Sequence, residues 1–425
     1  MVDFWILSVF CVCLFFLFMR TKRPTNFPPG PRAIPIFGNL LQLNIDNPLK
    51  DFERLAKRYG KVYSLYIGRP VVVLNGLKAI KEALVDKSEY FSGRPRNILV
   101  THVMEDKGVV MADFGPGWKE LRRFDLRTLR NFGMGKRSME NRILDELKHM
   151  VGRLEQSVGS ILDPQTLFHD AASNIIYLVL ISTRYEYGDK TLTEYVRVFK
   201  ENARIINGPW GMIYDAIPAA RYLPLPFKKA FSNTKILKQR TVNMLNKHNT
   251  TRVPGQPRDF VDCYLDEIDK KGEGFTFNQL QLVMHMLDLH FAGTDTTSNT
   301  LLAAFLYLIT HPHIQEKCQQ EIDVALEGKD HASFEDRHNM PYIQAVIYEC
   351  QRVASTVPLS VFHCTTRDTE LMGYSIPKGT LIIPNLTSVL NEEGQWKFPH
   401  EFNPSNFINE QGQVEKPEAF LPFSA

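Results

Sequence analysis

The chain has 425 residues, a formal net charge of +3, 44% hydrophobic residues and 11% aromatic residues. This composition can bury a sizeable core, which excludes a disordered chain, and the weak net charge gives no reason to expect nucleic-acid binding. Because no long low-complexity stretch divides the chain after residue 40, we expect one large domain behind a short N-terminal region.

Residues 4–19 are almost entirely apolar and predict a membrane anchor. As a helix they would span roughly 24 Å, slightly short of a hydrocarbon core of about 30 Å. Asp3 precedes this stretch, whereas Arg20, Lys22 and Arg23 follow it. The positive-inside tendency therefore places the rest of the chain in the cytosol, and we assign residues 1–23 to an anchor with a basic flank. A cleaved secretory signal is the alternative, but the basic residues follow the apolar stretch instead of preceding it, and no small-x-small cleavage site follows.

Residues 24–40 follow as a proline-rich segment that includes Pro28-Pro29-Gly30-Pro31. Proline fixes φ and removes a backbone donor, so the segment predicts a stiff, non-helical hinge that would hold the body at a set tilt to the membrane. An ordinary linker remains the alternative. The body, residues 41–425, has four scattered cysteines with no C-x-x-C spacing, which is neither a disulfide framework nor a zinc pattern.

The body is predicted to be mainly α-helical with small β-sheets. Residues 62–74 predict a hairpin that turns at Gly68-Arg69-Pro70, and residues 371–383 predict a second small β region broken at Pro377-Lys378-Gly379. Between them the pattern is mostly helical. Prolines interrupt it over residues 208–227, whose apolar tip is followed by two lysines. This tip either dips into a membrane surface or forms a buried loop, and the sequence favours neither.

Residues 278–310 predict a long helix that is buried on all sides and ends before Pro312. Its centre carries Ala292-Gly293-Thr294-Asp295-Thr296-Thr297. Thr296 can hydrogen-bond back to the carbonyl of Ala292 and so bend the helix. An acid beside a hydroxyl is what proton delivery to dioxygen needs. A kink with a satisfied polar patch is the structural alternative.

Two further helical pairs combine charge with burial. Glu349 and Arg352, at i and i+3, can pair on one helix face, and their apolar neighbours indicate a buried structural pair rather than a surface one. Trp118 and Arg122, at i and i+4, place an indole N–H beside a guanidinium. Such a pair suits a buried carboxylate, although a surface cation–π pair is the alternative.

The order of these motifs carries more information than any one of them. W-x-x-x-R is followed by A-G-x-D-T-T, E-x-x-R and, at residues 402–407, F-x-P-S-N-F. With the anchor and the proline-rich segment, this order closely resembles family 2 of the microsomal cytochrome P-450 enzymes, which are haem-thiolate monooxygenases. The resemblance covers essentially the whole chain. It implies the cytochrome P-450 fold, a haem b cofactor, a location at the endoplasmic reticulum membrane, and oxidation of small lipophilic substrates such as fatty acids, steroids or xenobiotics.

The resemblance also implies roles for individual residues. Asp295 and Thr296 match the family's acid–alcohol pair for catalysis, and Glu349 and Arg352 match its structural pair. The implied haem-propionate contacts are Arg94, Trp118, Arg122 and His363, and the implied substrate-pocket residues are Asp288, Ala292, Val357 and Val361. Where the family commonly has P-E-R-F, this chain has Asn406 as the third member of the Glu–Arg cluster. We expect Asn406 to accept a hydrogen bond from Arg352.

A basic run after Trp118 points to a protein partner. This surface resembles the family's docking site for an NADPH-dependent reductase, with cytochrome b5 as a further candidate partner, while a solvated helix face is the default alternative. NADPH would thus supply electrons only indirectly, through the reductase. The residues that form the core of the run are Lys119, Arg123, Arg127 and Arg130.

The last residues, 420–425, resemble the stretch that in the family leads into the loop whose cysteine binds the haem iron. We therefore expect a chain truncated before that loop and before the helix that follows it, with no metal ligand of its own. Such a chain would be inactive or impaired, and apolar surface would be exposed on the long central helix and on the helix of Glu349. The alternative is a haem-poor, membrane-anchored variant that binds the reductase without turnover.

Overall fold

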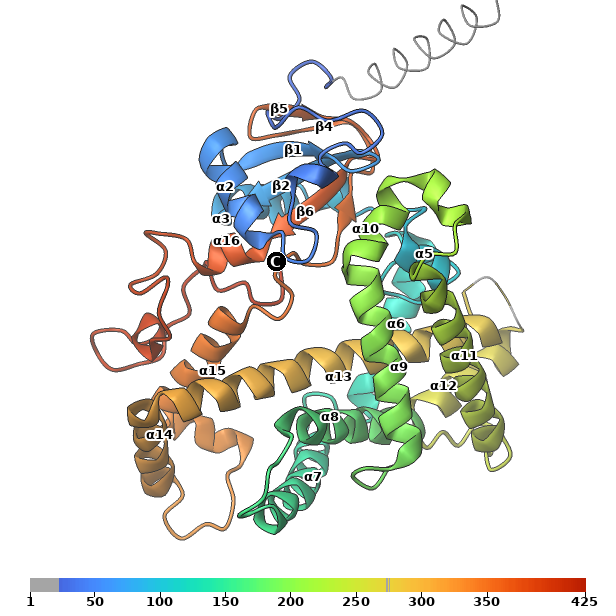
Figure 1. Cartoon of the computed structure of the whole chain (residues 1–425). Helices are drawn as coiled ribbons and strands as arrows, with labels where there is room; N and C mark the ends of the chain where they lie inside the picture. The colour runs from blue at the N-terminus through green and yellow to red at the C-terminus, as the bar shows by residue number, and fades with distance from the viewer. Residues whose placement is uncertain (1–22, 273, 275) are drawn as a thin grey trace, which may run out of the picture.

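Helices dominate the molecule, and two small sheets lie at one end of it (Figure 1). The computed structural model describes residues 23–272, 274 and 276–425. The architecture confirms the expected mainly helical body with small sheets. The helices are α2 (Leu49–Tyr59), α3 (Leu77–Lys81), α4 (Ser88–Phe91), α5 (Leu99–Val103), α6 (Pro116–Asn131), α7 (Arg137–Gln156), α8 (Pro164–Ile181), α9 (Lys190–Asn207), α10 (Pro209–Ala216), α11 (Phe227–Asn249), α12 (Phe260–Lys271), α13 (Gln279–Thr310), α14 (Pro312–Ala325), α15 (Pro341–Ala354) and α16 (Leu386–Leu390).

Single turns of other helix types connect several of these elements. One of them is π-helical and the rest are 3₁₀ turns. They are η1 (Leu40–Gln42), η2 (Glu82–Asp86, the π-helical one), η3 (Pro218–Tyr222), η4 (Phe334–Asn339) and η5 (Pro404–Phe407).

The larger sheet has the strand order β1-β2-β6-β3 and joins the two ends of the body. Strands β1 (Val62–Tyr66) and β2 (Pro70–Asn75) form the predicted antiparallel hairpin. Strand β6 (Leu381–Asn385) pairs with β2 in parallel, and β3 (His363–Cys364) pairs with β6. The predicted second β region is therefore wrong in one respect. It divides between two sheets, because only β4 (Thr369–Leu371) and β5 (Tyr374–Ile376) form their own hairpin.

Helix α13 is the longest element and crosses the helical part of the molecule (Figure 1). The Asn278 side chain caps its first turn by accepting from the backbone N–H of Gln281, and Pro312 starts the next helix just beyond its end. Near its middle, α13 lies so close to α8 that a Cβ on Gly293 would be 2.4 Å from Cδ1 of Ile176. Both predicted ends of this helix are confirmed.

The last turns of α13 are more open than the sequence predicts. The apolar side chains Leu301, Phe305, Leu306 and Ile309 are exposed, so the expectation of a helix buried on all sides is wrong for this part. Ile347 on α15 is also exposed.

The proline-rich segment packs along β1. The Ser64 hydroxyl donates to the carbonyl of Pro28, and the Ser64 backbone N–H donates to that of Pro29, each over 2.7 Å. A Cβ on Gly30 would lie 1.9 Å from the Ser64 carbonyl oxygen, so only glycine permits this approach. The predicted anchor, residues 4–19, lies outside the described residues. Among the helices that are described, none is both long enough and apolar enough to cross a bilayer.

Candidate functional site

The centre of α13 carries the predicted acid and alcohol. The Thr296 hydroxyl donates to the carbonyl oxygen of Ala292 over 2.6 Å, as the sequence predicts. Burial raises the pKa of the neighbouring Asp295 carboxyl above its usual value, although Asn299 and Lys200 act in the opposite direction. A carboxyl with a raised pKa holds its proton closer to neutral pH, which suits a group that passes protons on.

Polar side chains that sequence reasoning missed surround Asp295. His169, on α8, lies with Nε2 4.0 Å from Oδ1 of Asp295, and its Nδ1 lies 3.1 Å from the hydroxyl of Ser298. His290 and Thr294 border the same space. A signal for this group was present, because His290, Thr294 and Ser298 recur every four residues and so share one face of α13.

The predicted propionate contacts fall into two groups. Arg94 donates to the carbonyl of Phe362 over 2.9 Å, and it lies near enough to His363 to affect that residue's charge. Burial, together with Arg94, lowers the pKa of His363 to about 4. His363 Nδ1 lies 2.8 Å from the carbonyl oxygen of Phe91, so in the neutral ring Nδ1 carries the hydrogen and Nε2 is an acceptor. This ring needs a second proton before it can donate to a carboxylate.

The second group lies on α6. The indole N–H of Trp118 donates to the carbonyl of Val109 over 3.2 Å. Arg122 is exposed, and within the described part of the chain its guanidinium has no hydrogen-bond or ion-pair partner. Both residues line a hollow of about 590 Å³. Its other lining residues are Lys119, Arg123, Leu126, Arg127, Arg130 and Asn131.

The predicted pocket residues are in different environments. Asp288, on α13, accepts backbone hydrogen bonds from Val109 and Val110 over 2.8 and 3.0 Å. Gly108 has φ +89° and a Cβ there would be 2.2 Å from Asp288, so glycine permits the loop to approach. Asp288 thus holds a loop against α13. The other three predicted pocket residues differ in burial: Ala292 and Val361 are exposed, and Val357 packs partly buried against the core near the sheet.

Glu349 and Arg352 form the predicted pair in the interior. Their side chains are fully buried, with Arg352 Nη2 2.7 Å from Oε1 of Glu349. The predicted partner of Asn406 is wrong. Its amide N–H donates to Glu349 over 3.1 Å, and its oxygen accepts from the backbone N–H of Phe398. The other donors of Arg352 bond mainly to the backbone carbonyls of Leu390, Pro399 and Glu401.

The predicted propionate contacts have the donor chemistry that carboxylates such as those of haem need, although Trp118 already donates to Val109. The described cysteines do not offer a thiolate for the iron. Arg94, Arg122 and Trp118 are N–H donors of the kind that bind carboxylates. Burial raises the pKa of each described cysteine thiol, whereas a ligand to iron is a thiolate. The pKa values are about 11 for Cys263, Cys318 and Cys364 and about 12 for Cys350. The axial ligand is therefore not assigned to any of these four.

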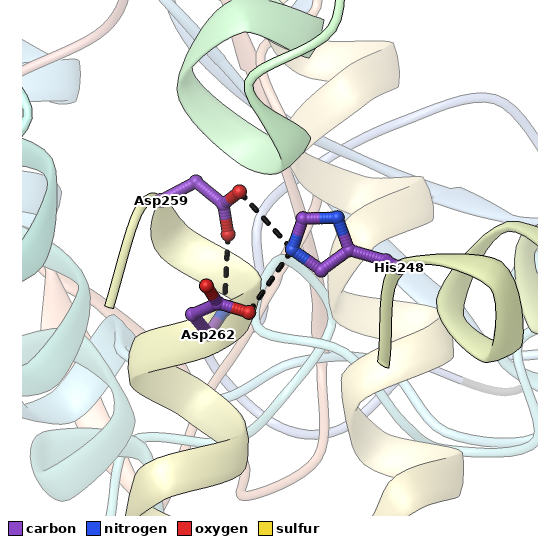
Figure 2. Close-up of side chains that lie close together, drawn as sticks. All are labelled: His248, Asp259 and Asp262. Carbon is purple, nitrogen blue, oxygen red and sulfur yellow. Dashed lines mark hydrogen bonds and ion pairs between the residues drawn. The ribbon is translucent and has the colours of Figure 1, made fainter. Parts of the chain in front are cut away.

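A separate polar cluster joins α11 to α12. Figure 2 shows Nε2 of His248 between the carboxylates of Asp259 and Asp262, at 3.1 and 3.0 Å. Imidazole and carboxylates of this kind can hold a divalent cation. Here, however, the Arg258 guanidinium supplies positive charge, because its Nε lies 2.7 Å from Oδ2 of Asp262 and its Nη2 lies 3.2 Å from Nε2 of His248.

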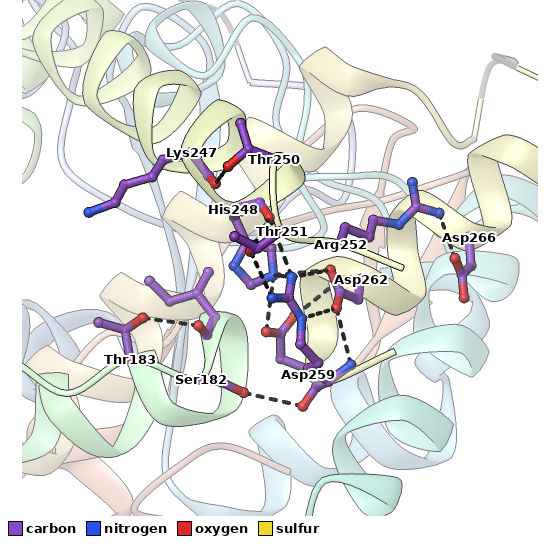
Figure 3. A network of polar contacts seen from close by, with 12 residues as sticks. Ser182, Thr183, Lys247, His248, Thr250, Thr251, Arg252, Asp259, Asp262 and Asp266 are labelled. Atoms are coloured by element: carbon purple, nitrogen blue, oxygen red, sulfur yellow. Dashed lines mark hydrogen bonds and ion pairs between the residues drawn. The ribbon is translucent and has the colours of Figure 1, made fainter. Parts of the chain in front are cut away.

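The same network extends to neighbouring turns (Figure 3). The Ser182 hydroxyl, just after α8, donates to the carbonyl of Arg258 over 3.2 Å. Arg252 bridges Asp266 and Asp269, each at 2.5 Å. These contacts tie the ends of three helices together. We therefore interpret the cluster as structural.

Comparisons with known proteins identify the family of the chain. Residues 28–425 match the family model described as Cytochrome P450. The chain is 40% identical to Cytochrome P450 2F2 of Mus musculus over 404 residues, which is 94% of this chain and 82% of the relative. It is 38% identical to Cytochrome P450 2B4 of Oryctolagus cuniculus and 40% identical to Cytochrome P450 2D3 of Rattus norvegicus. Each of these two alignments covers 99% of this chain and 86% of the relative.

Proposed function

The chain belongs to the cytochrome P450 family, whose members are haem-dependent monooxygenases, and we propose that it oxidises small lipophilic molecules such as fatty acids, steroids or xenobiotics. In this family NADPH supplies electrons indirectly, through a reductase. When bound, haem activates dioxygen so that one oxygen atom enters the substrate. The observation that carries the proposal is the Asp295–Thr296 pair in the middle of α13.

The chain's own residues would contribute proton handling and binding. Asp295, whose pKa is raised by burial, would hold a proton, and Thr296 would pass it toward the haem side of α13. Arg94 and Arg122 would bind the haem propionates as charged donors, with Trp118 as a neutral donor. His363 would join them once protonated. Val357, Val361 and Ala292 would contribute apolar contact to the substrate.

The basic hollow on α6 supports the proposal of a reductase site. Lys119, Arg123, Arg127 and Arg130 line one surface with Arg122. A cluster of positive charges attracts an acidic partner and speeds association. Because this attraction is electrostatic, binding becomes sensitive to salt. Cytochrome b5, as an alternative electron donor, would use the same surface.

We also propose attachment to the endoplasmic reticulum membrane through residues 1–23, with the body on the cytosolic side. A second contact is supported by the tip after α10, where Tyr222 and Leu223 are 90% and 52% exposed. Apolar side chains exposed beside lysines are typical of a segment that lies in a membrane interface. The exposure of these two side chains favours contact with a membrane surface over the alternative interpretation of the tip as a buried loop.

An assay of oxygen transfer in membranes tests the proposed monooxygenase activity. The protein is expressed with a reductase, and the membranes receive NADPH, ¹⁸O₂ and a panel of fatty acids, steroids and foreign compounds. We expect a product that carries one ¹⁸O atom and is not formed without NADPH. If haem-loaded protein with active reductase yields no labelled product from any class, the proposal is wrong.

The cations of the hollow on α6 would also serve a second candidate function, which is binding of the reductase without turnover. A carbon monoxide difference spectrum of the reduced protein separates the two. A Soret band at the thiolate position supports the monooxygenase. Reductase binding in the absence of that band supports the second candidate.

A further inference from the structure

A small cavity with both polar and apolar lining residues lies between α8, α9 and α13, beside the predicted catalytic acid. Its volume is about 20 Å³, and its polar lining consists of His169, Lys200, His290, Thr294 and Asp295. A water molecule needs about 10–15 Å³ of such space and two to four polar partners. The cavity therefore has the size and the lining for one water molecule.

Two of the lining residues have polar atoms without a protein partner. Both ring nitrogens of His290 and the hydroxyl of Thr294 are buried and make no hydrogen bond within the described residues. These side chains are 2% and 4% exposed. A buried polar group without a partner is destabilising, and proteins commonly satisfy such groups with ordered water.

Thr294 differs from other threonines of the same helix. Thr296, Thr300 and Thr310 each donate to a backbone carbonyl one turn earlier, over 2.6 to 2.9 Å. This is the usual way for a helical threonine to satisfy its hydroxyl. Thr294 does not make this bond, so its hydroxyl remains available to the cavity.

The charges around the cavity suit a neutral hydrogen-bonding site. Burial lowers the pKa of His290 to about 3 and that of His169 to about 4, so both rings are neutral at pH 7. A neutral imidazole offers one donor and one acceptor, which water can use. Lys200, on α9, has its pKa lowered by burial, while Asp163, Asp170 and Asp295 oppose that shift. His169 and Asp295 are 4.0 Å apart, which is too long for a direct hydrogen bond.

We propose that this cavity binds one ordered water molecule, held by His290 and Thr294, and that the water links the Asp295 carboxyl to the surface at Lys200. In the proton step, the Lys200 ammonium gives a proton to the water as the water gives another to the Asp295 carboxylate. One proton moves and the water is unchanged. The role of this step in oxygen chemistry rests on the proposed function, whereas the water site does not.

The water site is tested by NMR of the full chain with ¹⁵N-labelled histidine rings. The variant His290→Phe identifies the His290 resonance. We expect a cross-peak between His290 and a long-lived water. Thr294→Val, which removes a hydroxyl at nearly constant volume, should abolish the cross-peak and shift the His290 resonance. Thr310→Val is the matched control, because Thr310 is exposed and already bonded to its own helix.

Absence of the cross-peak in the unaltered chain overturns the water site, and so does a His290 resonance that Thr294→Val leaves unchanged. If Thr294→Val does not fold, the cross-peak in the unaltered chain is the test of the water site. The proton route is tested separately in haem-loaded protein with reductase. Lys200→Met and Thr294→Val should each divert NADPH electrons to hydrogen peroxide and lower product formation by about tenfold or more.

If both variants divert the same share of NADPH electrons to peroxide as the unaltered protein does, the proton route is wrong. The water site is not affected by that result. If the unaltered, haem-loaded protein does not turn over, the proposed function fails together with the proton route. The NMR result is independent of both outcomes.

Discussion

The guanidinium of Arg352 lies 2.7 Å from the carboxylate of Glu349, and neither side chain is exposed to solvent. Its other N–H groups donate to the carbonyls of Leu390, Pro399 and Glu401. The arginine thus joins α15 to the segment that follows α16. Both partners are desolvated, so neither tolerates loss of the other.

Arg352→Met should destabilise the protein by about 3–5 kcal/mol, because it leaves the Glu349 carboxylate buried without a counter-charge. Urea unfolding followed by circular dichroism measures the change. Lys57→Met is the control, since Lys57 pairs with Glu53 on the surface of α2 and its loss should leave stability nearly unchanged. Equal stability of the two variants would contradict a structural role for the buried pair.

Asp288→Ala should release the loop at Val109 and Val110, whose backbone N–H groups donate to that carboxylate. Each unpaired buried N–H costs about 1–3 kcal/mol, so the loop should open more often. Hydrogen–deuterium exchange at residues 108–110 is the measurement, and we expect faster exchange there. Asp330→Ala, at an exposed site, should leave that exchange as it is. Unchanged protection of the loop in Asp288→Ala would show that other contacts hold it.

His248 should make stability depend on pH. A hydrogen bond with Asp259 raises the pKa of His248 in the folded protein. Because the pKa is higher in the folded state, protonated His248 stabilises the fold fully below about pH 6.5, which is the pKa in the unfolded chain. This stabilisation is lost as pH rises through the folded-state pKa. The free energy of unfolding should therefore fall as pH rises above about 6.5, and His248→Gln should flatten this fall. A slope that is the same in both proteins would exclude His248 as its source.

Haem loading should raise the pKa of His363. In the described chain, burial and Arg94 hold that pKa at about 4, and Nδ1 already donates to Phe91. A propionate beside Nε2 would favour the protonated ring. Titration of ¹⁵N-labelled histidine with and without haem measures the shift. A pKa that stays near 4 after loading would mean that His363 does not contact a propionate.

Arg130→Glu should weaken reductase association, because it reverses one charge of the hollow on α6. We expect a slower association rate, with a smaller dependence on salt, and an unchanged dissociation rate. Stopped-flow mixing at several salt concentrations measures both. Arg54→Glu, on α2, is a matched control on another helix. If Arg54→Glu slows association as much as Arg130→Glu does, the partner recognises overall charge rather than this hollow.

Contacts between residues close in sequence were predictable. The bond from Thr296 to Ala292, the pairing of Glu349 with Arg352 and the ends of α13 all follow from helix spacing and capping. The hairpin of β1 and β2 follows from its short turn.

Contacts between segments far apart in the sequence were not predictable. Strand β6 pairs with β2 rather than with its nearer neighbour, because both are buried strands that need partners on both edges. Asn406 bonds to Glu349 because backbone carbonyls already occupy the Arg352 donors. His169 reaches Ser298 from a different helix, so no spacing rule could place it there.

The sequence by itself determined the family, the mainly helical class and the bond from Thr296 to Ala292, since these depend on residue types at fixed local spacing. Only the tertiary structure decided that Asp288 holds a loop, that the α6 cations line one hollow and that a small cavity adjoins Asp295. The physical reason is that burial and partner choice depend on which distant helices pack together. Local spacing places a side chain on a face, and packing determines what that face meets.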